Sequence, residues 1–181
     1  KLNASWVSSD FGYGRSEVPA VGPMEMCHLN AWKGERVSAQ FLLWSGEAKD
    51  GVECQISDFK SETAVLPATI AQARFVRYTV ADPQLYKFKK GREPVLAPDM
   101  LDSLSRFDMQ ARSVRPVWVS VDVPQDAEAG VYKAEVTVKH NGWGKVTLPL
   151  VLEVVNHVLA KPADWDYHLD LWQHPTSVAR A

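Results

Sequence analysis

Cysteine is scarce in this sequence of 181 residues. Its two cysteines, Cys27 and Cys54, are too few for a disulfide scaffold, and they stand in neither a CxxC pair nor a Cys/His zinc pattern. Nothing in their spacing points to a catalytic thiol. We expect two plain buried thiols, and a single disulfide between them remains the alternative.

Long apolar runs and an excess of one charge are missing as well. No apolar stretch approaches the roughly 20 residues that a membrane-spanning helix needs. The net charge is -2, and the 20 basic residues are spread along the chain. We therefore expect no membrane span and no nucleic-acid partner. The composition, with 46% hydrophobic and 23% charged residues, is that of an ordinary globular protein.

The sequence also lacks the common motifs of nucleophilic, phosphate and metal chemistry. It contains no glycine-rich phosphate loop, no GxSxG elbow and no His/Glu pair at metal-binding spacing. The five histidines are scattered along the chain. We therefore expect no cofactor, no metal site and no catalytic residue.

The sequence does contain many short runs in which apolar and polar residues alternate. The clearest are residues 37–43, 52–56, 117–123, 132–138 and 146–154, and weaker ones are 6–9, 24–29 and 74–80. This period is that of half-buried strands, and turn residues separate the runs. The pattern predicts an all-β fold, an antiparallel two-sheet β-sandwich of the immunoglobulin-like type.

The last two clear strands are joined by "HNGWG", which predicts a hairpin. Asn141 and Gly142 tolerate the positive φ of a tight turn. Trp143 is an aromatic residue on this turn, and it is either a sugar-stacking residue or a ring that packs across a neighbouring strand. Pro149 has no N–H for a ladder, which predicts an edge strand or a bulge there.

Residues 81–114 interrupt the alternation. We expect a long loop there with no strand and at most one or two helical turns around residues 99–107. Loops of this length in compact domains are usually functional, and we expect this one to reach toward an active-site mouth. A solvated insertion held by Leu96, Met100 and Leu104 is the alternative. The segment also contains a basic cluster, Lys87, Lys89, Lys90 and Arg92. Such a cluster is typical of a solvated surface, or attracts acidic glycans.

The end of the sequence reads as the start of a different kind of domain. Residues 156–165 have the Pro and Ala of a connector, and residues 167–173 alternate again. Pro175 ends that strand, and Thr176 or Ser177 is suited to cap a following helix. Strand, loop and helix in this order form the first unit of an α/β domain.

Two stretches carry a resemblance to a known family. "VSVDVPQDAEAGVYKAEVTV", residues 119–138, is similar to the last hairpin of the β-sandwich modules that precede catalytic barrels in bacterial glycoside hydrolases. "YHLDLWQHP", residues 167–175, resembles glycoside hydrolase family 123, the β-N-acetylgalactosaminidases. The resemblance implies an accessory sandwich over residues 1–160. It also implies that residues 161–181 are a linker and the first strand of a missing (β/α)8 catalytic barrel.

The resemblance also implies a reaction that this chain cannot perform. In that family the substrate's own acetamido group attacks the anomeric carbon, assisted by an adjacent Asp-Glu pair. No Asp-Glu dipeptide occurs in this sequence, so no catalytic role is carried over. If residues 167–173 form a barrel strand, its C-terminal end faces the sugar. The candidate contacts are then Trp172, Gln173 and His174, with Asp170 one step deeper. The alternative for Asp170 is a structural pair with His168.

The resemblance favours a non-catalytic N-terminal domain of a bacterial glycoside hydrolase that acts on N-acetyl-β-galactosaminide-containing glycans. Its expected partners are the catalytic barrel of the same protein and the glycan substrate. Its expected location is secreted, periplasmic or cell-surface. Two other classes stay open: a free-standing carbohydrate-binding module, and an adhesive or scaffold sandwich without a ligand.

Overall fold

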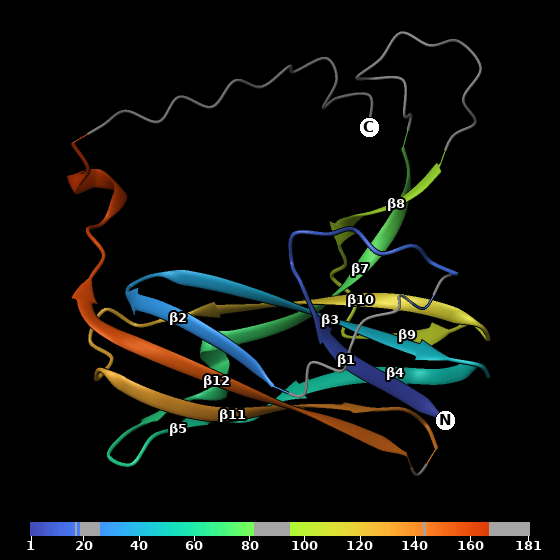
Figure 1. Ribbon diagram of the computed structural model, residues 1–181, viewed down its shortest axis with the longest axis horizontal. Helices are drawn as coiled ribbons and strands as arrows, with labels where there is room; N and C mark the ends of the chain where they lie inside the picture. Colours follow the sequence, from blue (N-terminus) through green and yellow to red (C-terminus); the bar gives the residue numbers. More distant parts are fainter. Residues whose placement is uncertain (17, 19–25, 82–94, 143, 167–181) are drawn as a thin grey trace, which may run out of the picture.

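The computed structural model describes residues 1–16, 18, 26–81, 95–142 and 144–166, and it consists of two β-sheets packed face to face (Figure 1). The first sheet contains, in spatial order, β1 (Leu2–Val7), β3 (Arg36–Ser45), β10 (Ser113–Asp122), β7 (Ala71–Ala81) and β8 (Val95–Leu101). The second contains β2 (Cys27–Lys33), β12 (Lys145–Val158), β11 (Gly130–Lys139), β4 (Lys49–Ile56) and β9 (Arg106–Met109). Short strands β5 (Phe59–Lys60) and β6 (Val65–Leu66) extend from β11, and the helical turns are η1 (Ala68–Ile70) and η3 (Pro162–Asp164). The predicted all-β sandwich is confirmed.

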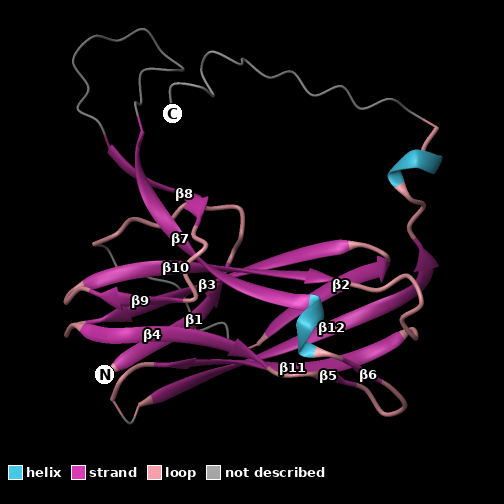
Figure 2. Ribbon diagram, turned by 180° about the vertical axis from the view of Figure 1, so that it is seen from behind, coloured by secondary structure: helices cyan, strands magenta, loops and turns pink. Residues whose placement is uncertain are grey.

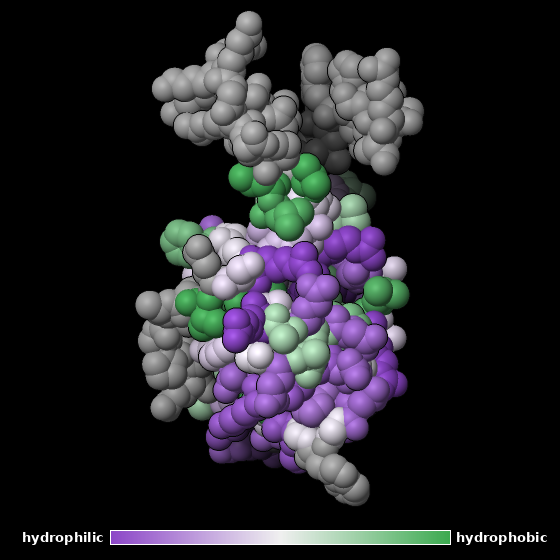
Figure 3. All heavy atoms as spheres, turned by 90° about the vertical axis from the view of Figure 1, so that its right-hand side faces the viewer, coloured by the Kyte–Doolittle hydropathy of each residue, from purple (hydrophilic) through white to green (hydrophobic). Residues whose placement is uncertain are grey.

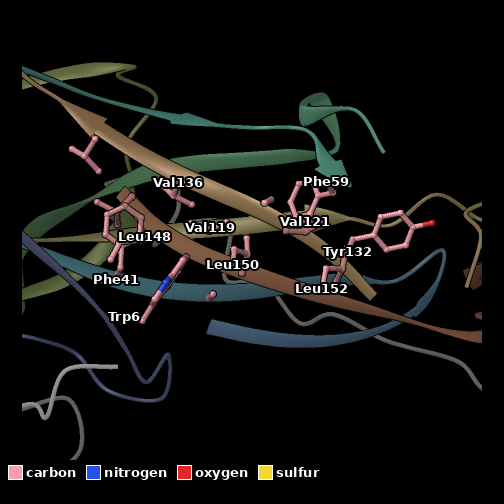
Figure 4. Close-up of a cluster of buried hydrophobic side chains, with 14 of the residues drawn as sticks. Trp6, Phe41, Phe59, Val119, Val121, Tyr132, Val136, Leu148, Leu150 and Leu152 are labelled. Atoms are coloured by element: carbon pink, nitrogen blue, oxygen red, sulfur yellow. The ribbon is translucent and has the colours of Figure 1, made fainter. Parts of the chain in front are cut away.

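The inward faces of the strands form one core between the sheets (Figure 4). Fully buried members of this core include Trp6, Phe41, Phe59, Val119, Val136, Leu150, Leu152 and Tyr132. The Trp6 ring meets Phe41 edge-on at 5.4 Å, and its Nε1 donates a hydrogen bond to the Pro149 carbonyl at 2.8 Å. The Tyr132 hydroxyl donates to the Glu128 carbonyl at 2.9 Å. Both large rings therefore bury their apolar surface without leaving a polar atom unpaired.

One pair of strands departs from the antiparallel prediction. β2 and β12 run parallel, from Cys27 opposite Leu150 to Lys33 opposite Val158. β2 and β3 lie in different sheets, and the turn between them contains Gly34 with a φ of 83°. Because this turn carries the chain from one sheet to the other, β2 pairs with β12 rather than with β3. The alternation of residues within a strand does not indicate which strand lies next to it.

The same pairing shows that the prediction of an edge strand at Pro149 is wrong, because β12 lies between β11 and β2. Pro149 is opposite Glu135 on β11. It stands one residue before the parallel pairing begins at Leu150, so its missing N–H falls outside the described β2–β12 pairing. The register irregularity of this strand lies farther on, between Val155 and Val158.

The outer face of β3 is buried too, although its alternation predicts a strand with one buried face. Gln40 and Leu42 point away from the core, yet both are buried. The segment after β1 covers them, because the Gln40 side-chain amide donates to the carbonyls of Ser8 at 2.9 Å and Phe11 at 3.2 Å. This cover places the following residues, including Arg15, beside β10, where the Val114 N–H donates to the Arg15 carbonyl at 2.7 Å.

The prediction of a long strandless loop over residues 81–114 is wrong. β8, β9 and the start of β10 all fall inside it, and no described residue in 99–107 is helical. β7 and β8 pair from Val76 opposite Leu101 to Ala81 opposite Val95, and this hairpin projects out of the sandwich (Figures 1 and 2). We call residues 76–81 and 95–101 the arm.

The predicted hairpin between β11 and β12 is confirmed, but its turn is not the tight one that Asn141-Gly142 indicates. The last pair is Lys139 opposite Lys145, and neither Asn141 nor Gly142 has a positive φ. The glycine instead makes room for His140, whose Nδ1 accepts the Gly142 N–H at 2.9 Å. A Cβ at Gly142 would lie only 2.7 Å from that ring.

The two cysteines are free thiols, so the disulfide alternative is wrong. Cys27 lies on β2 and Cys54 on β4, and β12 and β11 lie between those strands. Adjacent strands are about 4.8 Å apart, which puts the two positions beyond the reach of a disulfide.

Candidate functional site

The sugar-contact residues predicted from the sequence lie outside the described residues. These are Asp170, Trp172, Gln173 and His174, the sugar-stacking candidate Trp143, and the basic cluster between Lys87 and Arg92. Their roles stay predictions, as does the division of the chain at residue 160. The last described strand ends at Val158, followed by the turn η3.

The part of the chain that the structure describes offers neither a metal centre nor an activated thiol. Among those residues, no group of three or more His, Cys, Asp or Glu side chains is placed to hold a metal ion. Burial raises the pKa of Cys27 to about 11 and the pKa of Cys54 to about 12. Both thiols therefore stay protonated near neutral pH, and a protonated thiol is a poor nucleophile.

A clamp of aromatic rings and one arginine fastens the arm to the sandwich. The Arg115 guanidinium carbon on β10 lies 5.5 Å from the ring centre of Tyr78 and 4.9 Å from that of Phe107. Its Nη1 donates to the Val76 carbonyl at 2.9 Å. Burial lowers the pKa of Arg115, and burial raises the pKa of Tyr78 to about 12 against the opposing effect of nearby Arg115 and Arg15. The phenol is thus neutral, and the cation is held over two rings.

A second contact fixes the chain where it leaves β8. The Arg77 Nε donates to an Asp102 carboxylate oxygen at 2.9 Å, and the other oxygen accepts the Leu104 N–H at 3.1 Å. Burial alone would raise the pKa of Asp102. The hydrogen bond from the Leu104 N–H, together with the hydrogen bond and positive charge of Arg77, outweighs burial and lowers that pKa. The base of the arm is therefore held by two cation contacts, one on each side of β7.

Beside this base lies an open hollow of about 550 Å³, which we call the arginine hollow. It is lined by residues 14–16, Leu96 and residues 110–113. The Arg15 Nη2 donates to the Gln110 side-chain oxygen at 2.5 Å. Arg112 has a φ of 54°, the only positive φ of a described residue other than glycine, and its N–H donates to the Ser45 carbonyl at 2.9 Å. Two guanidinium groups and a leucine side chain can bind an anionic group with an apolar neighbour, but they cannot hydrolyse a bond.

The described surface offers no flat aromatic platform for a sugar. Its exposed large aromatic side chains are Phe11, in the segment after β1, and Trp32, on β2. The Trp32 ring already packs edge-on against His157 at 4.4 Å. Another hollow, of about 620 Å³, is lined by residues 60–63, residues 129–131 and Lys133, none of them aromatic. Sugar-binding sites usually rely on stacked rings, so these features do not favour a binding module.

No helix among the described residues is long and apolar enough to span a membrane.

Comparisons with known proteins agree with this geometry. A family model described as the glycoside hydrolase 123 N-terminal domain matches residues 6–140. A solved family 123 glycoside hydrolase from Clostridium perfringens, studied for glycolipid glycan hydrolysis, superposes with a TM-score of 0.87 at 20% identity. The match covers 99% of this chain and 32% of that enzyme, so this chain spans about a third of that enzyme's length.

Weaker likenesses to other β-rich domains carry no functional argument. A PapD-like domain of human CEP192 has a TM-score of 0.41 at 10% identity, and the match covers 73% of this chain and 82% of that chain. The periplasmic chaperone SfaE has a TM-score of 0.38 at 7% identity, covering 77% of this chain and 59% of that chain. No protein with curated annotation matches the sequence. The match to the family model over residues 6–140 shows that the chain belongs to the glycoside hydrolase 123 N-terminal domain family.

Proposed function

We propose that this chain is the non-catalytic N-terminal domain of a glycoside hydrolase, and that it supports the catalytic domain that follows it. The observation that carries the proposal is the family match over residues 6–140, together with a fold that corresponds to only 32% of a family 123 enzyme. The chemistry then belongs to the catalytic domain, and the sandwich contributes a rigid surface.

For the substrate we propose glycans that contain N-acetyl-β-galactosaminide. This proposal rests on the resemblance of "YHLDLWQHP", residues 167–175, to the family 123 enzymes. Under it, Trp172 would stack on the apolar face of the sugar, while Gln173, His174 and Asp170 would lie near its polar groups.

The test compares the full-length gene product with the 181-residue chain on 4-nitrophenyl N-acetyl-β-galactosaminide. We expect nitrophenol release by the full-length protein and none by the chain. The matched control is the aryl β-galactoside, which lacks the acetamido group and should be inert if the substrate's amide is the nucleophile. Turnover by the chain alone contradicts the supporting role. Turnover of the β-galactoside at an equal rate contradicts the proposed substrate class.

A free-standing carbohydrate-binding module predicts a different result. Calorimetry would then show binding of a GalNAc-containing glycan to the 181-residue chain. The described surface lacks an aromatic platform, so we expect no heat of binding above that of buffer dilution. Saturable binding would favour the module over the supporting domain.

A further inference from the structure

The arm presents apolar side chains to water on both of its faces. Val80 and Leu96 lie opposite each other on one face, and Val95 and Met100 lie on the other. Val80 is 73% exposed and Met100 is 51% exposed. Figure 3 shows strongly hydrophobic residues gathered where the arm rises from a largely hydrophilic body.

Such an arm is poorly suited to stand alone. A two-stranded ribbon is marginally stable in water unless a third strand or a packed surface supports it. Below Val76 the sandwich supplies that support, because β7 pairs with β10 from Ala71 to Phe75. Above that point β8 is the only described strand that pairs with β7, and the contacts with the sandwich include those of Val76 with Arg115 and of the Tyr78 hydroxyl, which donates to the Tyr13 carbonyl at 2.9 Å. Exposed apolar side chains gathered on so short a ribbon give the arm the character of a contact surface.

The arginine hollow adds charge to this surface. Leu96 belongs both to the arm and to the hollow, where it is a neighbour of Arg15 and Arg112. Among the described residues, neither of these arginines forms an ion pair within 4 Å. Arg112 occupies a left-handed backbone position that glycine would hold with less strain. A guanidinium kept at such a position, beside a second one, suits the binding of a carboxylate.

The course of the chain indicates which partner meets the arm. The last described element, η3, rises from one end of the sandwich, and the arm rises at the other end on the same side (Figures 1 and 2). A domain that follows η3 therefore starts on the side from which the arm projects. The family 123 enzyme, of which this fold accounts for 32%, has most of its chain outside the sandwich.

We propose that the arm is the docking element for the catalytic domain of the same polypeptide. Apolar side chains of that domain cover both faces of the arm, and one of its carboxylates enters the arginine hollow between Arg15 and Arg112. This inference rests on the proposed function, and it specifies which surface the catalytic domain contacts.

The experiment is hydroxyl-radical footprinting of the full-length gene product, read by mass spectrometry at two methionines. Met100 on the arm is 51% exposed, and Met26 before β2 is 43% exposed, which makes it a matched internal reference. We expect Met100 to be oxidised at least five-fold more slowly than Met26. Leu96→Asp should raise Met100 oxidation toward the Met26 rate, whereas Val131→Asp, at an exposed position on β11, should leave the ratio unchanged.

A second variant separates docking from folding. Arg112→Gly removes the guanidinium but suits the left-handed backbone, so the sandwich keeps its stability. We expect at least a two-fold rise in Met100 oxidation with no fall in the midpoint of thermal unfolding. Equal oxidation of Met100 and Met26 in the unsubstituted protein overturns the inference. Protection of Met100 that disappears on dilution identifies a second copy of the chain as the partner, and it overturns the inference as well. Either result leaves the hydrolysis assay of the proposed function unaffected.

Discussion

The interior of the sandwich and the arm are built from the same kinds of apolar residue but stand in opposite surroundings. Between the sheets, Leu43 on β3 is fully buried, whereas Leu96 on the arm is about half exposed. The core therefore derives its stability from the chain itself. The arm has apolar surface that the described chain does not cover, and this is the surface that we propose for contact with the catalytic domain.

The largest expected effect of a substitution on stability is at Trp6 in the core. Its ring is buried against Phe41, and its Nε1 donates to the Pro149 carbonyl. Trp6→Ala should lower the free energy of unfolding of the 181-residue chain by about 3–5 kcal/mol, measured by urea denaturation. Phe11→Ala, at an exposed position, should change it by less than about 0.5 kcal/mol. Equal costs for the two would contradict the assignment of Trp6 to the core.

The half-buried thiol of Cys54 predicts a loss of stability at alkaline pH. Burial raises its pKa from 9.0 to about 12, so in the folded chain the thiol stays protonated while the unfolded chain ionises. The contribution is complete below pH 9 and is lost as pH rises toward 12, at about 1.4 kcal/mol per pH unit. Cys54→Val should flatten the fall in unfolding free energy between pH 9 and 11. An unchanged slope would mean that the thiol is accessible to water.

A smaller effect is expected at Tyr132, whose buried hydroxyl donates to the Glu128 carbonyl. Tyr132→Phe should cost about 1 kcal/mol in urea denaturation, because the Glu128 carbonyl loses the donor that the fully buried Tyr132 side chain supplies. Tyr13→Phe is the control, since its hydroxyl donates to the Ser8 carbonyl at 3.2 Å in a partly exposed site. We expect less than about 0.5 kcal/mol there. A larger cost for Tyr13→Phe than for Tyr132→Phe would contradict the assignment of Tyr132 to the core.

The smallest effect is expected on the arm itself. Leu96→Ala should change the unfolding free energy of the 181-residue chain by less than about 0.5 kcal/mol, because the side chain is already half in water. The same change at Leu43 should cost about 2–5 kcal/mol. A comparable cost at both leucines would show that the chain itself packs the arm, and that no partner is needed to cover it.

Strands with one buried face and one solvent-exposed face could be predicted from the sequence. β11 and β12 alternate because their outer faces reach solvent, and the hairpin between them was predicted correctly. The strand of residues 37–43 was predicted with the right inward face. The cover over its outer face was missed, because Ser8 and Phe11 come from a segment with no pattern of its own.

The arm and the arginine hollow could not be predicted from the sequence, again because their residues form no recognisable pattern. β8 is exposed or half-exposed along its whole length, so no alternation marks it as a strand. Arg15, Leu96 and Arg112 are brought together only by the folding of three separate segments, and no spacing motif joins them. The positive φ of Arg112 was equally hidden, since glycine would be the expected residue there.

The most direct test of the central claim, that this sandwich is one domain of a larger hydrolase, is the intact mass of the native gene product. We predict a mass about three times the 20.2 kDa of this chain, in line with its 32% share of the family 123 enzyme. A mass of 20.2 kDa, or that mass plus a short leader, would contradict it. The arm would then have to be covered by something other than a following domain.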